Sequence, residues 1–335
     1  MELKKYDSID EAISSCPSNQ TIIDNIVKAW TYINDDKYKK IVCSISGGSD
    51  SDVMLDICWR CDKNNKISYV WYDTGLEYQA TKDHLKFLEE KYKIEIIKEK
   101  AVKSIPYSCK NIGQPFLNKT VSEYMQRLQR NGFKWENEDF DTLYKRYPNC
   151  KIALGWWCNT HLSDNFNIRR NKWLKEFILA SPPQFKISNR CCDYAKKKVV
   201  KALVKNNEYD LNIFGIRKAE GGARAQAHKS CFDNNDDGCD NYKPLFWYTN
   251  HDKEEYETHF GVTHSKCYSE YGLTRTGCSG CPYGRDFEGE LKVIQKYETR
   301  LFTAVNNIFK DSYEYTRKYR EFYKEQNKLL KPLDK

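Results

Sequence analysis

One stretch of the chain consists of small and polar residues in an order that suits phosphate binding: Ser46-Gly47-Gly48-Ser49-Asp50-Ser51. Two adjacent glycines let the backbone approach an anion closely, and the serine hydroxyls add hydrogen-bond donors. The stretch follows the apolar run 41–45 and precedes a helical pattern that includes Val53 and Ile57. It therefore lies at a helix N-terminus, where unpaired N–H groups and the helix dipole attract negative charge. The sequence predicts a phosphate-binding loop, and the alternative is a tight turn whose serines cap the helix.

Cysteines form the second group of residues that could do chemistry. The chain has 14 of them, and without an export signal clustered cysteines indicate metal, iron–sulfur or redox chemistry before disulfides. Cys191-Cys192 and Cys278-x-x-Cys281 together offer four thiolates, which suit an iron–sulfur cluster or a tetrahedral zinc ion. The adjacent pair favours the larger cluster, because neighbouring side chains diverge. The alternative is a pair of core residues and a separate reducible pair.

Three further cysteines of the same half could replace one of the adjacent pair or carry sulfur: Cys231, Cys239 and Cys267. Cys58 and Cys61 have redox spacing, but they fall inside a predicted helix. We expect this last pair to be structural, because buried cysteine behaves as a small apolar residue.

The elements around these residues predict an α/β fold with a doubly wound, mostly parallel sheet. Strand patterns occur at 41–45, 67–72, 94–97 and 211–214. Helical patterns occur at about 9–16, 18–33, 53–58, 77–92, 160–180, 191–204 and 285–325, with Ser18 as the expected cap of the second. Strands that alternate with helices are typical of parallel sheets with right-handed crossovers. The predicted domains are 1–225, a nucleotide-binding α/β domain with an insertion at about 105–150, and 226–335, a cysteine-rich segment with C-terminal helices.

Composition excludes several classes of protein. Of the 335 residues, 40% are hydrophobic and 14% aromatic, which is enough to form a core and excludes global disorder. No apolar run of about 18 or more residues occurs, so a transmembrane helix is not expected. The formal net charge of +8 suits a protein that handles anions, although a solvated lysine-rich surface explains it equally well. The first residues contain no apolar signal segment, so we expect a cytoplasmic protein.

The motifs together resemble a known family. The 46–51 stretch after a first strand is similar to the PP-loop of ATP pyrophosphatases, and the chain most resembles the phosphoadenosine phosphosulfate (PAPS) reductase family within that superfamily. The resemblance covers about residues 25–285, and three further stretches carry it. One is an aromatic-x-Asp-Thr-Gly-x-Glu segment with Asp73, Thr74, Gly75 and Glu77. The others are Gly215-Ile216-Arg217, followed by Glu220 and Arg224, and Pro244-Leu245-Phe246-Trp247 before an acidic helix.

The resemblance implies a set of ligands and roles. ATP or an adenylylsulfate-type nucleotide would lie across the carboxyl ends of the strands, bound by the loop and by the residues of the Asp73–Glu77 segment. Asp73 would accept from ribose hydroxyls or the adenine amine, or hold Mg²⁺; the alternative for it is a helix cap. Asp50, Arg217 and Arg224 would be catalytic, the arginines neutralising phosphate or sulfate oxygens unless they form surface salt bridges. The four paired cysteines are similar to the [4Fe–4S] pattern of the adenosine-phosphosulfate reductases.

Two features depart from the reductases. Those enzymes carry a nucleophilic cysteine in a Glu-Cys-Gly context near the C-terminus, whereas the last cysteine here is Cys281. Asp50 keeps the acidic form of the loop that accompanies ATP hydrolysis. Both features favour cleavage of ATP between the α- and β-phosphates, so that an acceptor is adenylated for iron–sulfur-assisted sulfur transfer, as in DndC-like or tRNA-thiolating proteins.

Two alternatives remain open. One is a sulfonucleotide reductase that releases sulfite by means of another thiol, and the other is a non-catalytic, metal-stapled nucleotide or nucleic-acid binding protein. The expected partners are an adenine nucleotide, a sulfur donor protein and a nucleic-acid acceptor, with no membrane. A homodimer is left open.

Overall fold

The computed structural model describes residues 3–221, 227–235 and 238–329. The chain divides into two compact units, each built from two segments. The first unit comprises residues 1–102 and 196–278, and the second comprises 103–195 and 279–335. The predicted boundary near residue 225 therefore falls inside the first unit, and the predicted insertion at 105–150 falls inside the second.

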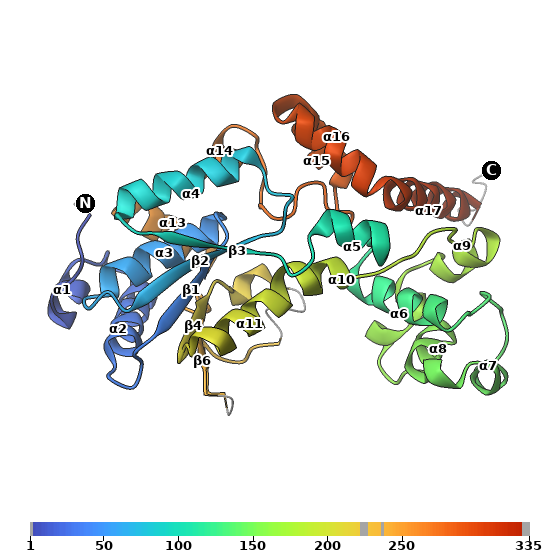
Figure 1. The fold of residues 1–335 in the computed structure, drawn as a ribbon, viewed down its shortest axis with the longest axis horizontal. Helices are drawn as coiled ribbons and strands as arrows, with labels where there is room; N and C mark the ends of the chain where they lie inside the picture. Colours follow the sequence, from blue (N-terminus) through green and yellow to red (C-terminus); the bar gives the residue numbers. More distant parts are fainter. Residues whose placement is uncertain (1–2, 222–226, 236–237, 330–335) are drawn as a thin grey trace, which may run out of the picture. The chain divides into compact units, whose positions relative to one another are not determined.

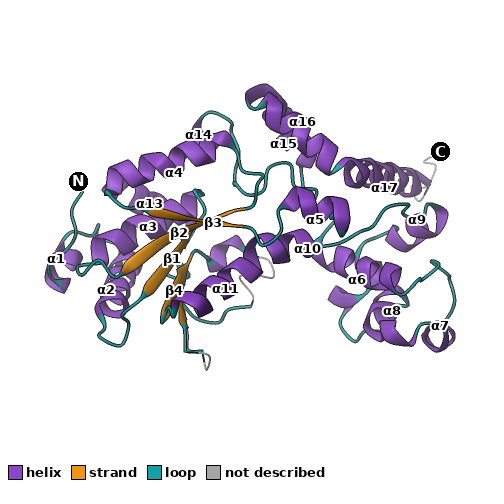
Figure 2. Ribbon diagram, in the orientation of Figure 1, coloured by secondary structure: helices purple, strands orange, loops and turns teal. Residues whose placement is uncertain are grey.

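The first unit is built on one six-stranded sheet with the order β3-β2-β1-β4-β6-β5 (Figure 2). The strands are β1 (Ile41–Ile45), β2 (Ile67–Asp73), β3 (Ile96–Lys100), β4 (Leu211–Phe214), β5 (Phe232–Asp233) and β6 (Asp240–Tyr242). All neighbours are parallel except β5 and β6. The predicted doubly wound, mostly parallel sheet is confirmed, with the third strand two residues later than expected and two short strands that the sequence did not indicate.

Alternation along β1 explains the two layers of helices on the sheet. Ile41, Cys43 and Ile45 are buried in the larger core, together with residues of α2 (Gln20–Asn34), α3 (Ser49–Cys61), α4 (Gln79–Tyr92) and α13 (Asn250–Phe260). Val42 points to the other face and packs with Leu203 of α11 (Lys198–Asn207). Side chains of a strand alternate between faces, so a strand with apolar residues on both faces must be covered on both. Figure 1 shows these helices around the sheet.

Several helices begin or break at places that differ from the sequence prediction. The α2 cap is Asn19, which accepts from the Ile22 N–H, rather than Ser18. Within 160–180 only α9 (Leu174–Ala180) is α-helical, preceded by two 3₁₀ turns. The helix expected from Cys191 onward is divided into α10 (Arg190–Cys192), a π-helical turn (Asp193–Lys197) and α11. Residues 9–14 form the short helix α1 as expected.

The second unit is helical and has an aromatic core. Its helices besides α9 and α10 are α5 (Ile105–Asn111), α6 (Lys119–Arg130), α7 (Phe140–Arg146), α8 (Lys151–Trp157), α15 (Phe287–Tyr297), α16 (Thr299–Ile308) and α17 (Lys310–Leu329). Trp156 and Trp157 are buried in this core, and α17 adds Tyr315 and Tyr319 to it. The C-terminal helices are therefore part of the same core as residues 103–195. Among the described residues, no helix is long and apolar enough to cross a membrane.

Candidate functional site

The 46–51 loop joins β1 to α3 at the carboxyl edge of the sheet. The Ser51 hydroxyl accepts from the Ser46 N–H at 2.9 Å, and the Ser46 hydroxyl accepts from the Gly48 N–H at 3.3 Å. Gly47 has φ +66°, and a Cβ there would lie 2.9 Å from the Thr81 Cγ2, so this turn requires glycine. The helix that follows begins at Ser49, directly after the glycines and four residues before the predicted helical pattern, so that Ser49, Asp50 and Ser51 form its first turn.

A distant segment of the first unit lies over this loop. The Tyr268 hydroxyl accepts from the Ser49 N–H at 3.0 Å and lies 3.3 Å from the Thr276 hydroxyl. A Cβ at Gly48 would meet both, at 3.3 Å from the tyrosine oxygen and 3.1 Å from the threonine oxygen. The cysteine-rich part of the chain thus contributes directly to the phosphate-binding loop. No motif in the sequence indicated these two residues.

Asp50 is bracketed by two cations. The Arg217 Nε donates to its Oδ2 at 2.9 Å, and the Lys253 Nζ lies 3.8 Å from its Oδ1. Arg217 also donates to the Asn250 Oδ1 at 2.9 Å. Asp50 follows β1 and Arg217 follows β4, and these neighbouring strands lie where the chain order reverses in the sheet. Open α/β sheets bind their ligands at such a switch point.

The other residues of the Gly-x-Arg pattern are placed less closely. Glu220 lies in a 3₁₀ turn after Arg217 and is exposed to solvent. Arg224 lies outside the described residues, so its predicted role remains a prediction. Of the three predicted catalytic residues, Asp50 and Arg217 are brought together.

Asp73 and Glu77 form a carboxyl pair after β2. The Glu77 Oε1 accepts from the Thr74 N–H at 3.0 Å and from its hydroxyl at 2.5 Å. Burial raises the pKa of Glu77, and the neighbouring Asp73 carboxyl raises it further. Burial also acts to raise the pKa of Asp73, but hydrogen bonds from Lys98 and from the Gly75 N–H outweigh it and lower that pKa. The two neighbouring carboxyls therefore differ, with the pKa of Asp73 below its ordinary value and the pKa of Glu77 above its own.

Asp73 is not a helix cap, which was the alternative for it. The next helix, α4, begins at Gln79 and has Tyr78 at its cap position. The Asp73 Oδ1 instead accepts from the Gly75 N–H at 2.8 Å and its Oδ2 lies 2.8 Å from the Lys98 Nζ. The carboxylate is thus held at the end of β2, on the same edge of the sheet as the loop.

A network of buried charges supports α3 from beneath the loop. Asp52, whose side chain is 1% exposed, accepts from His264 at 2.8 Å and lies 3.0 Å from the Nε2 of His84. The other ring nitrogen of His264 is 2.8 Å from Glu257, which pairs with Lys253 at 2.6 Å. Burial alone would lower the pKa of His264, but its bonds to Asp52 and Glu257 raise it to about 9. His264 is therefore a cation at neutral pH, and no motif in the sequence indicated this network.

Three of the four predicted cluster cysteines lie in the second unit. Cys191 is buried and hydrogen-bonds the thiols of Cys109 and Cys192, and it interacts electrostatically with Cys281. The bond to Cys109 raises the pKa of Cys191. Cys109 was assigned no role from the sequence, but α5, which carries it, packs against α10.

The fourth predicted ligand, Cys278, is the last residue of the first unit. Its Sγ lies 3.6 Å from the Thr74 hydroxyl oxygen. Cys267, also in the first unit, lies at the same distance from the Thr81 hydroxyl oxygen. The Cys58 thiol is fully buried and hydrogen-bonds Cys43, in agreement with the structural role expected of it.

The residues fit the implied iron–sulfur group in part. Cys191, Cys192 and Cys281 are thiols of one compact unit. In the described part of the chain, however, no three Cys, His, Asp or Glu side chains are gathered as a metal ion requires.

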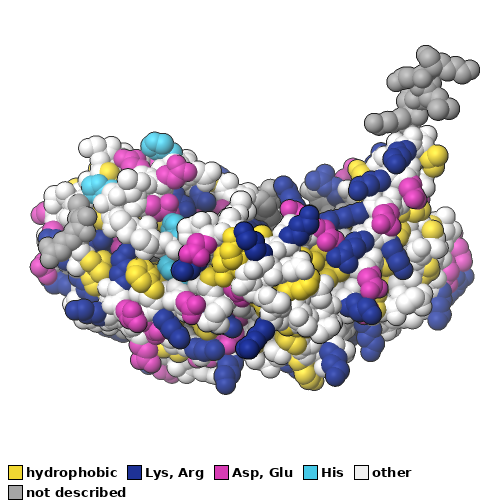
Figure 3. Space-filling model, turned by 90° about the horizontal axis from the view of Figure 1, so that it is seen from above, with side chains coloured by type: hydrophobic (Ala, Val, Ile, Leu, Met, Phe, Trp, Pro, Cys, Tyr) yellow, Lys and Arg dark blue, Asp and Glu magenta, His cyan; other side chains and the backbone are white. Residues whose placement is uncertain are grey.

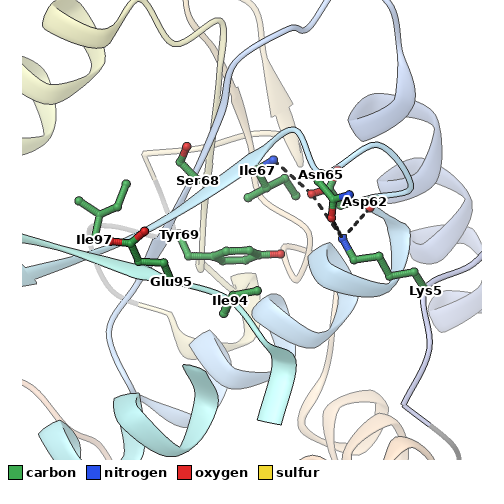
Figure 4. Close-up of a pocket in the computed structure, with 9 residues that line it drawn as sticks. All are labelled: Lys5, Asp62, Asn65, Ile67, Ser68, Tyr69, Ile94, Glu95 and Ile97. Atoms are coloured by element: carbon green, nitrogen blue, oxygen red, sulfur yellow. Dashed lines mark hydrogen bonds and ion pairs between the residues drawn. The ribbon is translucent and has the colours of Figure 1, made fainter. Parts of the chain in front are cut away.

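A pocket of the first unit lies at the amino edge of the sheet, opposite the edge that carries the 46–51 loop. It has a volume of about 260 Å³ and is lined by residues at the amino ends of β2 and β3, among them Ile67 and Ile94 (Figure 4). Lys5 reaches into this region and donates to the Asn65 Oδ1 at 2.7 Å and to the Asp62 carbonyl at 2.8 Å. These bonds anchor the N-terminal segment, and the pocket is separate from the loop that was predicted to bind nucleotide.

Comparisons with known proteins agree with the motifs. Residues 40–152 match the phosphoadenosine phosphosulfate reductase domain. An uncharacterised protein of Methanocaldococcus jannaschii is 26% identical over 185 residues, which are 53% of this chain and 37% of that protein. The chain therefore spans well under half the length of this relative.

Three solved structures are similar at low identity. Phosphoadenylyl-sulfate reductase from Candida auris is 12% identical with a TM-score of 0.40, and the match covers 82% of this chain and 97% of that one. The U34-tRNA thiolase NcsA from Methanococcus maripaludis, solved with its [4Fe-4S] cluster, is 13% identical with a TM-score of 0.37, and the match covers 90% of this chain and 78% of that one. NH₃-dependent NAD synthetase from Campylobacter jejuni is 11% identical with a TM-score of 0.34, and the match covers 87% of this chain and 95% of that one. Residues 40–152, which carry the 46–51 loop and the Asp73–Glu77 segment, are the part of the chain that is similar to the phosphoadenosine phosphosulfate reductase domain.

Proposed function

We propose that the protein is a cytoplasmic enzyme that binds an adenine nucleotide at the 46–51 loop and cleaves ATP between its α- and β-phosphates to adenylate an acceptor. The observation that carries this proposal is the Asp50–Arg217 pair at 2.9 Å beside the loop. It lies at the switch point between β1 and β4, where a ligand of an open α/β sheet is expected.

Each residue of the edge has a part in this reaction. The acceptor attacks the α-phosphorus, the bond to the bridging oxygen breaks, and pyrophosphate leaves with the electron pair. Loop N–H groups and the α3 N-terminus bind the phosphates. Arg217 gives up its hydrogen bond to Asp50 and donates to phosphate oxygens instead. Asp50 and Asp73 then supply the carboxylate oxygens that Mg²⁺ prefers. Arg224 is proposed as a second arginine from the sequence pattern alone.

An iron–sulfur cluster is proposed at the paired cysteines. Cys191, Cys192, Cys278 and Cys281 would hold it, with zinc as the alternative metal, and Cys109 is a further thiol that hydrogen-bonds Cys191. When bound, the cluster would supply iron and sulfide for sulfur transfer from a donor protein. Support for the site comes from the three thiols of the second unit, of which Cys191 is buried and Cys192 and Cys281 are half-buried.

A nucleic acid is proposed as the acceptor, because the positive charge is concentrated in one unit. The second unit has 27 Lys and Arg residues against 17 Asp and Glu, whereas the first has 28 against 30. The net charges are therefore +10 and −2. Figure 3 shows many Lys and Arg side chains on the surface over the C-terminal helices. A polyanion is attracted to such a surface.

One observation favours the second candidate, a sulfonucleotide reductase. The Cys278 Sγ lies 3.6 Å from the Thr74 hydroxyl oxygen, in the segment proposed to bind the nucleotide. In that reaction a thiolate attacks the sulfate sulfur, the sulfur–oxygen bond to the phosphate breaks, and the nucleotide leaves with the electron pair. An external dithiol then reduces the resulting thiosulfonate and releases sulfite.

A turnover assay separates the two candidates. The anaerobically purified protein is given ATP with bulk nucleic acid as acceptor, or an adenylylsulfate with a dithiol, and pyrophosphate and sulfite are measured. We expect the native protein to release pyrophosphate. Asp50→Asn should abolish this release, and the surface control Asp24→Asn should leave it unchanged. Release of sulfite instead, lost in Cys278→Ser, would establish the reductase. Release of neither product would contradict both.

The cluster has its own test. We expect the anaerobic protein to be brown, with matching iron and sulfide, and Cys281→Ser to lose both. Cys109→Ser should shift the visible spectrum, because its thiol contacts Cys191, whereas the buried control Cys150→Ser should not. Stoichiometric zinc without iron would replace the cluster by the alternative metal, and a metal-free protein would remove the site.

A further inference from the structure

Lys253 lies beside the phosphate-binding loop, although nothing in the sequence singled it out. It belongs to the first turn of α13, and its side chain is only 13% exposed. The ammonium is 3.8 Å from the Asp50 Oδ1, while Arg217 donates to the other oxygen of that carboxylate. Two cations from different elements therefore converge on the loop where phosphates are proposed to bind.

The position of Lys253 is fixed by a ring of charges that closes on α3. Lys253 pairs with Glu257 at 2.6 Å, Glu257 with His264 at 2.8 Å, and His264 with Asp52 at 2.8 Å. Asp52 is two residues beyond Asp50 on the same helix. Three carboxylates thus face three cations, counting Arg217. Because a long lysine side chain loses rotamer freedom when it is held, this ring places the ammonium at the loop before a ligand arrives.

The contact with Asp50 is the loosest of these bonds. At 3.8 Å it exceeds hydrogen-bond length, whereas the bond to Glu257 is well within it. An ammonium group has three donors, and Glu257 accepts from one. Glu257 also has His264 as a second cationic partner, so a shift of Lys253 toward an incoming anion leaves no buried carboxylate without a partner.

We propose that Lys253 binds the β- and γ-phosphates of the nucleotide and neutralises the pyrophosphate as it leaves. The inference rests on the proposed function. When the bond from the α-phosphorus to the bridging oxygen breaks, negative charge grows on the pyrophosphate, and Lys253 and Arg217 are the cations beside the loop that meet it. A nucleoside monophosphate lacks the groups that Lys253 contacts, so the lysine discriminates between ATP and AMP.

The test compares three ligands in the full chain by titration calorimetry: ATP, pyrophosphate and AMP. Lys253→Met keeps the aliphatic stem and removes the charge. We expect it to weaken ATP and pyrophosphate binding at least tenfold and AMP binding less than twofold. Lys253→Arg should restore most of the affinity. Lys266→Met is the matched control, because Lys266 is an exposed lysine of the same unit that pairs with Glu270.

A second variant keeps the inference testable if Lys253→Met unfolds. Lys253→Met combined with Glu257→Gln removes one charge of each sign, so the buried ring stays balanced, and we expect pyrophosphate binding to remain weak. Three outcomes would each overturn the assignment. They are recovered pyrophosphate binding in the double variant, unchanged binding of all three ligands in Lys253→Met, and an equal loss of affinity for AMP and ATP in Lys253→Met. A native chain that binds neither ATP nor pyrophosphate would instead overturn the proposed function itself.

Discussion

His264 is the residue whose charge should be visible in the stability of the protein. Its pKa of about 9 lies above the 6.5 of an unfolded histidine, so the folded state binds the proton more tightly. This contribution is complete below pH 6.5 and is lost as the pH rises through 9. Its full size is at most about 3 kcal/mol at 1.36 kcal/mol per pKa unit. Asp52, Glu257 and the Tyr268 ring contact the imidazole directly, while His84 and Lys253 contact the two carboxylates.

We expect the urea midpoint of the native protein to fall between pH 6 and pH 9.5 and His264→Gln to flatten that fall. The glutamine keeps polar contacts to Asp52 and Glu257 but does not titrate. His251→Gln is the control, because the side chain of His251 is 82% exposed. An equal slope in the native protein and His264→Gln would show that the network does not hold the proton.

At the scale of single residues, the sequence indicated those whose partners are close in the chain. Ser46–Ser51 and Asp73–Glu77 were found because each group is a local motif after a strand. Lys253, Tyr268 and Cys109 were not found, because their roles depend on contacts with residues far away in the sequence. Tyr268 and Ser49, for example, are 219 residues apart. No spacing rule within a short window can indicate such a pair.

Among the elements, the segment that carries Tyr268 and Thr276 occupies part of the loop that was proposed to bind phosphate. The Tyr268 hydroxyl accepts from the Ser49 N–H, which is one of the donors an anion would use. A bound phosphate and this hydroxyl therefore compete for the same group. The segment belongs to the binding site rather than to a separate cysteine-rich region.

Tyr268→Phe removes the competing oxygen and keeps the ring. We expect the free energy of unfolding to fall by about 1 kcal/mol, because one hydrogen bond is lost, and pyrophosphate to bind a few-fold more tightly. Thermal denaturation and calorimetry measure the two effects. Tyr107→Phe, at an exposed tyrosine of the second unit, should change neither. Weaker pyrophosphate binding in Tyr268→Phe would mean that the hydroxyl contacts the anion directly.

Element prediction succeeded where apolar patterns were long and failed where they were short. β1 was predicted at its observed bounds and α4 within two residues of them, whereas α3 extends four residues before and three after the predicted 53–58 pattern. Almost all residues of α3 are buried, so its sequence shows no single apolar face that would mark its ends. β5 and β6 have two and three residues, which is too few to show any period. The π-helical turn after Cys192 was also missed, since a helical pattern does not reveal one extra residue per turn.

For the whole molecule, the difference in charge between the units predicts how it meets a polyanion. Single-stranded polynucleotide binding should weaken steeply between 50 and 200 mM salt, because each neutralised phosphate releases a counterion. Lys292→Glu with Lys296→Glu, on α15 of the second unit, should lower the affinity about tenfold. Fluorescence anisotropy at several salt concentrations measures both effects.

A matched pair of lysines in the first unit serves as the control. Lys201 and Lys205 on α11 are also exposed and four residues apart. We expect Lys201→Glu with Lys205→Glu to change the affinity less than twofold. An equal loss in both pairs would mean that total charge, and not the second unit, attracts the polynucleotide.

The chain passes between the two units three times, after residues 102, 195 and 278. A protease that cuts one of these crossings leaves the units joined by the other two, so a single nick should not release either of them as a fragment. The same order of segments along the chain also affects folding during synthesis on the ribosome. β4 pairs with β1, but it emerges about 170 residues later, after the whole of the second unit's first segment. Until β4 has been synthesised, the edge of β1 that pairs with it has no neighbouring strand. We therefore expect a chaperone to bind the growing chain at this strand.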